Sequence, residues 1–386
     1  MGAKTRDLGV AAPRHLRIAA ALCACLAAAA LLAAPAGATG GQSGFFGVGG
    51  WSYPTAAQSA SLGSAGVRLF RGAVGWGVIQ PSADPHSRNW SDPDRLAREA
   101  AADGYNILFD LNGCAVWACG AIDAAPSSGV ALAEYESFVR AAAARYAPGS
   151  AFWKGQRRIP AITWQIWNEV NGGVFWPDPT PAAYAAFFTA IAASIRSVDR
   201  HASVLMSGLD ALPTLSSGIP LGRFLSGLYE QPGFAAATSG VAVQAYAPTP
   251  RAALAVLDEA REVMLRHRDG AKPMWVTEMG WATGGPPYPF TVSPARQARF
   301  LTTTWREMLA CRTRWNLRHV LWFSLEDANP ALFGQPDGWS FHDGLLNLDG
   351  TPKLAYSNFL ALVGRATSAS GAGRCTLPGG RSLERR

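Results

Sequence analysis

Charged side chains are scarce in this sequence of 386 residues, since Asp, Glu, Lys and Arg together make up 16% of it. No basic run occurs, and the formal net charge of +7 falls to +4 when the first 38 residues are set aside. Proteins that bind nucleic acid do so mainly through clustered Lys and Arg. We therefore expect no nucleic-acid partner, and the composition suits a globular enzyme better than a disordered chain.

Several signatures of well-known chemistry are absent as well. The sequence has no Gly-x-Ser-x-Gly elbow of the serine hydrolases. Residues 47–51 contain glycines without the spacing of a dinucleotide-binding loop. The 6 histidines are scattered without metal-ligand spacing, and no repeat of solenoid length is present. We expect an enzyme that uses no metal and no other cofactor.

Residues 1–38 have the layout of a secretory signal peptide. Basic residues precede an apolar stretch from Ile18 to Ala34, and Ala36-Gly37-Ala38 provides a small-residue cleavage site. The stretch is short for a spanning helix, and we expect no later segment to be long and apolar enough to form one. The chain is therefore expected to be secreted and extracellular, without stable membrane insertion. A retained amino-terminal anchor is the alternative.

Four cysteines follow the predicted signal peptide: Cys114, Cys119, Cys311 and Cys375. Export to an oxidising compartment favours disulfides. A short Cys114–Cys119 loop would leave Cys311 and Cys375 to tie the tail to a late helix. Four cysteines permit three pairings, and the sequence does not choose among them. A zinc site is the alternative, although no histidine is near and the spacing does not suit it.

Short apolar runs alternate with longer helical patterns from residue 44 to residue 364. Eight runs predict strands, at residues 45–51, 67–73, 107–111, 162–167, 203–209, 241–246, 274–277 and 320–325. Helical patterns cover residues 131–146, 181–198, 250–267 and 294–310. This alternation predicts a parallel sheet covered by helices, and eight repeats predict a closed (β/α)8 barrel. We expect one catalytic domain over residues 39–365 and a flexible tail over residues 366–386.

Two of the predicted strands end in glutamate. Residues 164–171 are Trp-Gln-Ile-Trp-Asn-Glu-Val-Asn, and residues 274–281 are Met-Trp-Val-Thr-Glu-Met-Gly-Trp. An unpaired carboxylate is costly to bury, and active sites of such barrels lie at the carboxyl ends of the strands. Glu169 and Glu278 are therefore expected to face each other across the barrel mouth, where paired carboxyls suit glycosidic chemistry. Structural ion pairing is the alternative.

Both motifs resemble signature strands of the clan A retaining glycoside hydrolases, a superfamily that includes families 5 and 39. Residues 66–71 (Gly-Val-Arg-Leu-Phe-Arg) are similar to the second strand of that clan, and Val116-Trp117-Ala118 resembles its aromatic turn after the third strand. The resemblance covers nearly all of the chain after residue 38. It implies an (β/α)8 TIM barrel that cleaves β-linked O-glycosidic bonds with retention.

The resemblance also implies a role for each matching residue. Glu169 would be the general acid/base and Glu278 the nucleophile of a double displacement. Asn168 would hydrogen-bond the sugar 2-hydroxyl. Arg71, rather than Arg68, would place a positive charge beside the nucleophile.

The remaining residues that we expect in the site would line the walls of the sugar-binding cleft. Tyr246 would donate a hydrogen bond to the nucleophile, and Trp322 would offer a stacking face to the sugar, with Trp339 as its neighbour. Gln244 stands where the clan often has a histidine, and an amide hydrogen-bonds without carrying charge. Five tryptophans at or after strand ends are candidates to line the cleft: Trp51, Trp76, Trp117, Trp176 and Trp281.

We expect the partner to be a polysaccharide or oligosaccharide, bound by a monomer. Two further readings of the same residues stay open. One is a transglycosylase that uses the same glutamate pair but passes the sugar to another sugar. The other is a catalytically inactive carbohydrate-binding barrel, although binding alone does not need a matched pair of glutamates.

Overall fold

The structure is a computed structural model that describes residues 44–122, 124–213, 215–366 and Cys375. The described part contains one sheet of nine parallel strands in the order β5-β4-β3-β2-β1-β9-β8-β7-β6. Their bounds are β1 Phe46–Gly49, β2 Leu69–Gly75, β3 Asn106–Asn112, β4 Ile162–Ile166, β5 Ser203–Leu205, β6 Leu209–Asp210, β7 Val241–Gln244, β8 Met274–Glu278 and β9 Leu317–Trp322.

The sheet closes into a ring because β5 and β6 are two pieces of one segment. They are separated by residues 206–208, and Gly208 forms a bridge to Asn168 across this interruption. A Cβ on Gly208 would lie 2.5 Å from the Thr277 hydroxyl, so the backbone passes close to β8 here. The predicted (β/α)8 barrel is confirmed, with β5 and β6 as its fifth strand. The prediction of one unbroken strand over residues 203–209 is wrong.

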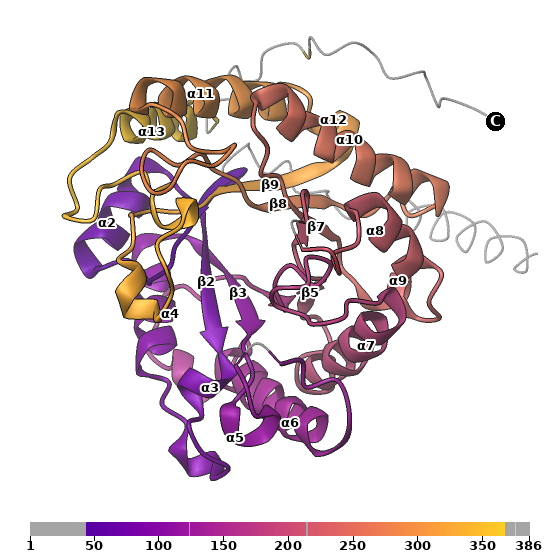
Figure 1. Ribbon diagram of the computed structural model, residues 1–386. Coiled ribbons are helices and arrows are strands. Elements are labelled where there is room, and N and C mark those ends of the chain that lie inside the picture. Colours follow the sequence, from indigo (N-terminus) through magenta and orange to yellow (C-terminus); the bar gives the residue numbers. More distant parts are fainter. Residues whose placement is uncertain (1–43, 123, 214, 367–374, 376–386) are drawn as a thin grey trace, which may run out of the picture. The chain divides into compact units, whose positions relative to one another are not determined.

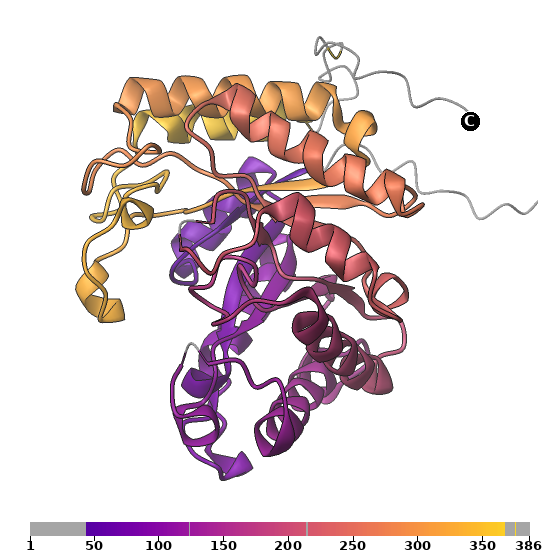
Figure 2. The same cartoon turned by 45° about the vertical axis from the view of Figure 1, so that its right-hand side comes forward.

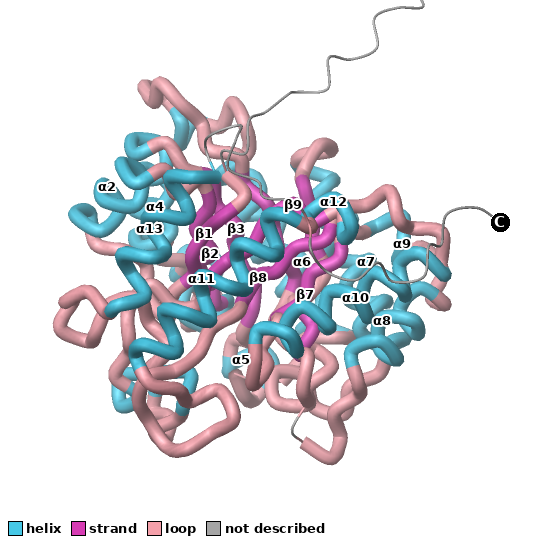
Figure 3. Tube along the Cα trace, turned by 90° about the horizontal axis from the view of Figure 1, so that it is seen from above, coloured by secondary structure: helices cyan, strands magenta, loops and turns pink. Residues whose placement is uncertain are grey.

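Helices surround the ring of strands, as Figures 1 and 3 show. The longer ones are α2 Ala56–Ala65, α4 Ser91–Asp103, α6 Gly129–Tyr146, α7 Pro181–Val198, α8 Leu221–Tyr229, α10 Pro250–Arg266, α11 Pro294–Ala310 and α13 Leu354–Ala366. The short ones are α3 Trp76–Ile79, α5 Val116–Cys119, α9 Phe234–Ala237, α12 Arg312–Trp315, and the 3-10 turns η1 Pro85–Ser87, η2 Ala151–Trp153, η3 Pro330–Phe333 and η4 Trp339–Phe341.

The helix starts follow from local chemistry. Proline opens α7, α10 and α11, where its missing N–H costs little. The residue before each proline accepts a hydrogen bond from a backbone N–H of the first turn, and these caps are Thr180, Thr249 and Ser293. Figure 2 shows α11 and α13 side by side, and Asn358 donates to the Thr302 hydroxyl across them at 3.1 Å.

One described helix, α7, is long and apolar enough to cross a membrane by length and composition. Our expectation that no segment after the amino terminus would meet that test is therefore wrong. The reason is that α7 is a core helix: Tyr184, Phe188 and Ile191 are fully buried, and the Tyr184 hydroxyl donates to the Ile166 carbonyl of β4 at 2.7 Å. An apolar helix buried against a barrel satisfies the same criterion.

The barrel interior is apolar at one end and polar at the other. An inward cluster fills the end where the strands begin, and it consists of Leu69, Leu108, Leu205, Trp275 and Leu321. Side chains alternate along a strand, so the next inward positions toward the carboxyl ends are Arg71, Asp110, Thr277 and Phe323. The apolar cluster thus closes the base, and polar groups are concentrated at the mouth.

Two disulfides join the four cysteines of the predicted catalytic domain and tail. Cys114 is bonded to Cys119, and Cys311, at the end of α11, is bonded to Cys375. Among the three pairings that the sequence permitted, the structure has this one. The predicted signal peptide at residues 1–38 and the predicted tail, apart from Ala366 and Cys375, lie outside the described residues.

Candidate active site

Polar side chains from five parts of the ring meet at its carboxyl end. Arg71 belongs to β2, Asp110 to β3, Gln244 to β7 and Glu278 to β8, and Asn168 follows β4. Each of these residues is at most 9% exposed. Polar groups buried to this extent require hydrogen-bond partners, and the partners that they find are one another.

The guanidinium of Arg71 is the centre of this network. Its Nη1 donates to Glu278 Oε1 at 2.5 Å, and its Nη2 donates to Asp110 Oδ2 at 2.8 Å. Nη2 also donates to Asn168 Oδ1 at 3.0 Å, and Nε donates to Gln165 Oε1 at 2.9 Å. One cation therefore binds two buried carboxylates and orients two amides, which the rigid fork of arginine permits.

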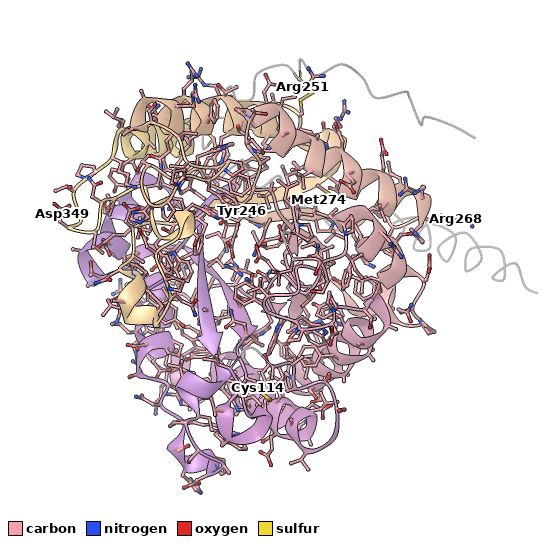
Figure 4. All side chains as sticks on the ribbon, viewed as in Figure 1. Cys114, Tyr246, Arg251, Arg268, Met274 and Asp349 are labelled. Carbon is pink, nitrogen blue, oxygen red and sulfur yellow. A yellow bond between two sulfur atoms is a disulfide. The ribbon has the colours of Figure 1, made fainter. Side chains whose placement is uncertain are left out.

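Glu278 accepts three hydrogen bonds. Besides the bond from Arg71, Gln244 Nε2 donates to Oε1 at 2.8 Å and the Tyr246 hydroxyl donates to Oε2 at 2.9 Å. An irregularity in the β7–β8 pairing places Gln244 opposite Glu278. An ionised carboxylate is a pure acceptor, so three donors suit a Glu278 that carries its charge. Figure 4 places Tyr246 toward the middle of the ring of strands.

The turn that carries Glu169 has an unusual backbone. Trp167 has a φ of 70° and Glu169 a φ of 42°. Residues other than glycine rarely adopt this left-handed region, and they hold it only where the surroundings fix them. The Trp167 indole donates to the Phe175 carbonyl at 2.6 Å, and the Glu169 N–H donates to the Gly208 carbonyl at 3.1 Å. The turn is therefore anchored on both sides, and it directs Glu169 to the mouth.

The electrostatic surroundings of Glu169 favour its protonated form. Burial is the largest influence that raises the pKa of Glu169 well above its ordinary value, and the negative charges of Asp210 and Glu278 add to it. The positive charge of Arg71 opposes them. No hydrogen bond to the Glu169 carboxylate is present among the described residues. A carboxyl in such surroundings can keep a proton near neutral pH.

Two other groups of the network are shifted in the same direction. Burial raises the pKa of Asp110 to about 6, while the neighbouring guanidinium of Arg71 opposes the rise. Burial and the charge of Glu278 raise the pKa of Tyr246 well above its ordinary value. The phenol therefore stays a neutral hydrogen-bond donor over the whole working range of pH.

Aromatic rings form a wall beside Tyr246. Trp339 packs against it with ring centroids 4.9 Å apart, and Tyr288 stacks on Trp339 at 5.7 Å. Phe290 packs on all three rings. Trp339 and Tyr288 are partly exposed. They lie in residues 284–290 and 330–339. Partly exposed aromatic faces suit the apolar face of a sugar ring.

A groove of about 440 Å³ adjoins the network. Trp51, Tyr53, Asn112 and Phe333 are among its lining residues. Asn112 Nδ2 donates to Asp110 Oδ2 at 2.6 Å, so the groove connects to the buried carboxylates through this amide.

The predicted stacking role of Trp322 is wrong. Its ring is fully buried, lies between the rings of Trp281 and Trp305, and donates to the Asp343 carbonyl at 2.9 Å. Because side chains alternate along β9, Trp322 points toward α11 and its neighbour Phe323 points inward. Phe323 was missed by the sequence reasoning, although counting alternate positions from Leu321 would have found it.

The inward direction of Phe323 is visible at Gly49. A Cβ on Gly49 would lie 3.3 Å from a ring carbon of Phe323 and 3.5 Å from the Cβ of Arg71. The three residues therefore share the inner face of the barrel, and Phe323 also packs on Trp51 with centroids 5.5 Å apart. The Phe323 ring therefore lies beside Arg71.

The other tryptophans divide between core and rim. Trp76, Trp176 and Trp281 are at most 3% exposed, so we withdraw them as cleft-lining candidates. Trp51 and Trp117 keep part of their surface. The Trp117 indole donates to the Gln80 carbonyl at 2.9 Å and packs on Trp76. Within the described residues, no group of three or more His, Cys, Asp or Glu side chains is placed to hold a metal ion.

Comparison with known proteins gives a clear result for the fold. No protein-family profile matches the sequence, and no curated protein resembles it in sequence. A glucosidase from Croceicoccus marinus has a TM-score of 0.62 at 18% identity, over 85% of this chain and 69% of its own. A GH5_18 enzyme from Streptomyces cattleya, solved with Manβ1-4GlcNAc, has a TM-score of 0.64 at 18% identity, over 86% and 83%.

A GH39 β-xylosidase from Caulobacter crescentus has a TM-score of 0.57 at 17% identity, over 84% of this chain and 72% of its own. The chain therefore has the (β/α)8 fold of these family 5 and family 39 glycosidases, as its two glutamate motifs predicted.

Proposed function

We propose that this chain hydrolyses β-linked O-glycosidic bonds of a polysaccharide or oligosaccharide with retention of configuration. The observation that carries the proposal is the contrast between two glutamates at one barrel mouth. Glu278 accepts three hydrogen bonds, one of them from a guanidinium, whereas Glu169 accepts none from the described residues. One carboxyl is thereby suited to attack as an anion and the other to supply a proton.

In the first step, a carboxylate oxygen of Glu278 forms a bond to the anomeric carbon. The bond from that carbon to the leaving oxygen breaks, and the proton of Glu169 moves to this oxygen. Arg71 and Gln244 both donate to Asn168 Oδ1, so the Nδ2 of Asn168 is left as a donor. It would hydrogen-bond the sugar 2-hydroxyl, an interaction that strengthens in the transition state.

In the second step, water attacks the anomeric carbon and the bond to Glu278 breaks. Glu169, now ionised, takes the proton from this water and returns to its starting form. When Glu278 regains its negative charge, it accepts hydrogen bonds from three donors, namely Arg71, Gln244 and Tyr246. Because they are held in place throughout, little reorganisation is needed at either step.

The names of similar structures support a β-linked substrate. They include an exo-β-1,4-mannosidase, a β-xylosidase and β-1,4-galactanases. We propose in addition that the chain is exported after removal of residues 1–38. The two disulfides support this, because such bonds persist in oxidising compartments.

The test uses Glu169→Ala and Glu278→Ala with a panel of aryl β-glycosides, and Glu262→Ala as the control. Glu262 is an exposed residue of α10, so its variant should keep normal activity. Both active-site variants should lose turnover by orders of magnitude. With azide, Glu169→Ala should form a β-glycosyl azide and Glu278→Ala an α-glycosyl azide. Near-normal turnover in both variants would refute the proposal.

The same panel separates hydrolysis from transfer to a second sugar. Products are analysed with and without added acceptor sugars. Free sugar as the main product in the presence of acceptor supports hydrolysis, whereas a larger oligosaccharide as the main product would assign the glutamate pair to a transglycosylase.

A further inference from the structure

Asp210 is a second carboxylate near the acid/base, and the proposed reaction gives it no role. It ends β6, the short strand that completes the ring. Resting on the proposed glycosidase function, we propose that Asp210 is a positioning residue whose ionised carboxylate keeps the catalytic proton on Glu169. Asp210 would contact neither the leaving oxygen nor the anomeric carbon, and it would act through Glu169.

The backbone brings Asp210 to the level of the reacting groups. Asp210 pairs with Gln244 across β6 and β7, and Gln244 pairs in turn with Glu278 on β8. Two residues before Asp210, the Gly208 carbonyl accepts the N–H of Glu169 at 3.1 Å. Asp210 and the turn that carries Glu169 are therefore parts of one connected edge of the barrel mouth.

Asn171 fixes this turn to Asp210. Its side chain is fully buried, its Nδ2 donates to the Asp210 carbonyl at 2.9 Å, and its Oδ1 accepts the Asp210 N–H at 2.8 Å. The Asn171 Nδ2 also donates to the Ile219 carbonyl at 3.0 Å. A Cβ on Gly172 would lie 3.3 Å from both Asp210 Oδ2 and the Glu169 carbonyl, so the Asp210 carboxylate lies against the turn itself.

Hydrogen bonding decides which of the two carboxyls holds the proton. Asp210 Oδ1 accepts the N–H of Leu212 at 2.8 Å, and a donated hydrogen bond favours the ionised form. Glu169 has no such donor among the described residues. When two neighbouring carboxyls repel each other, the proton belongs to the one without a donor. The pKa values of both groups are raised, chiefly by burial, and the charge of Asp210 is the second influence on Glu169.

Other charged and titratable groups also face Glu169: Arg71 from β2, Asp110 from β3, Glu278 from β8, Tyr246 after β7, and Tyr288 from the loop of residues 284–290. Asp110 and Glu278 are both bound to the Arg71 guanidinium. In the part of the chain that the structure describes, no Lys, Arg or His forms an ion pair with Asp210. Its charge is therefore not cancelled locally.

The arrangement would serve both steps of the reaction. Before the first step, the anion of Asp210 opposes ionisation of Glu169, so the proton is present when the leaving oxygen needs it. After that proton is transferred, two carboxylates face each other. Their repulsion makes Glu169 a stronger base toward the attacking water, and the proton that it takes restores the starting state. Asp210 stays ionised throughout.

Asp210→Asn tests this inference, because asparagine keeps an oxygen for the Leu212 N–H and removes only the charge. Asp349→Asn is the matched control: Asp349 is exposed, and Figure 4 places it at the outer edge of the structure. We would measure kcat/KM against pH with an alkyl β-glycoside, whose departure needs a proton, and with a dinitrophenyl β-glycoside, whose departure does not.

With the alkyl glycoside, the alkaline limb of Asp210→Asn should move down by about one pH unit. Activity above that limb should then be about tenfold below wild type. The acid limb, the dinitrophenyl profile and Asp349→Asn should not change, and Asp210→Glu should restore much of the wild-type limb. An unmoved alkaline limb in Asp210→Asn overturns the inference, even if KM or stability changes. Failure of the proposed function is distinct, since the wild type would then cleave none of the glycosides.

Discussion

Arg71 Nη1 lies 2.5 Å from Glu278 Oε1, and both residues are less than a tenth exposed. The same guanidinium binds Asp110, so one buried cation faces two carboxyls. Burial raises the pKa of Asp110 to about 6, with the charge of Glu278 adding to the rise. A covalent bond between Glu278 and a sugar would remove one negative charge, and Asp110 would then balance Arg71 alone. The network is therefore suited to both the free and the glycosylated enzyme.

This geometry predicts that Arg71→Lys lowers kcat/KM by about 100-fold. A lysine is a single point of charge, so it cannot reproduce the fork that holds Glu278, Asp110 and Asn168 together. The matched control is Arg68→Lys, because the hydrogen bonds of the Arg68 side chain within the described residues go to the carbonyls of Gly63 and Val67. Steady-state kinetics on an aryl glycoside would check both variants. Equal activity of the two would show that a charge alone is enough at position 71.

The two neighbours at the end of β9 predict opposite effects. Trp322→Ala removes a fully buried ring, which should lower the free energy of unfolding by about 3–5 kcal/mol and leave kcat/KM of the folded enzyme unchanged. Phe323→Ala should lower kcat/KM about tenfold through lost packing beside Arg71. Urea unfolding and steady-state kinetics on the same preparations separate the two effects. A larger kinetic defect in Trp322→Ala would reverse our assignment of the two faces.

The periodicity of the sequence predicted most of this architecture, and the exceptions have physical causes. Alternating apolar runs and helix-capping residues depend on local chemistry, so the helices from Pro181, Pro250 and Pro294 were found at their first residue. The interruption of the fifth strand at Gly208 was missed, because it depends on close contact with Thr277 from β8. A contact between residues this far apart leaves no pattern in either segment.

Some residues of the candidate site were likewise found from the sequence, whereas others were missed or wrongly assigned. Glu169 and Glu278 were found because a carboxylate at the end of a buried strand is costly unless it is paired or functional. The resemblance supplied Arg71 and Tyr246. Asp210 was not found, although it directly follows the predicted strand of residues 203–209, because the resemblance assigned it no role. Trp322 was wrongly assigned because a strand end was matched without fixing its register, and a shift of one residue reverses the face of every side chain.

His319 predicts acid sensitivity that is unrelated to catalysis. Burial lowers the pKa of His319 to about 3, although its Nδ1 lies 2.6 Å from the Gly44 carbonyl. Below an ordinary pKa of about 6.5, His319 binds a proton in the unfolded chain but stays neutral in the folded chain. The folded state is therefore not penalised by His319 above pH 6.5, and it loses stability relative to the unfolded chain as the pH falls from 6.5 toward 3.

His319→Asn, which is neutral throughout this range, should unfold less readily in acid relative to its own stability at neutral pH. Between about pH 6 and pH 4, the slope of its unfolding free energy against pH should be smaller than that of wild type by at most about 1.4 kcal/mol per pH unit. Urea titrations at a series of pH values would measure both slopes. Parallel slopes would mean that His319 is protonated in the folded state.

The two disulfides predict unequal contributions to stability. Cys114–Cys119 joins cysteines 5 positions apart, whereas Cys311–Cys375 joins cysteines 64 positions apart. The loss of chain entropy in the unfolded state grows with the loop, so the bonds should contribute about 2 and about 4 kcal/mol respectively. Paired Cys→Ser variants, compared by urea unfolding, would give the order. A larger effect of the Cys114–Cys119 pair would contradict the entropic argument.

The last prediction concerns Gln244, whose side-chain amide binds the proposed nucleophile. Its Nε2 donates to Glu278 Oε1 at 2.8 Å and to Asn168 Oδ1 at 2.7 Å, and an amide keeps its donors at every pH. Gln244→Leu removes both bonds, while Arg71 and Tyr246 still bind Glu278, so kcat/KM should fall about tenfold to 100-fold.

Gln244→His introduces a group that titrates near pH 6.5, and it is the comparison that isolates the amide. Its charged form would support ionised Glu278 but would face Arg71, which repels it. The profile of kcat/KM against pH should therefore gain a new inflection in Gln244→His, which neither wild type nor Gln244→Leu shows. A profile of unchanged shape in all three proteins would mean that the side chain at position 244 does not act on the nucleophile.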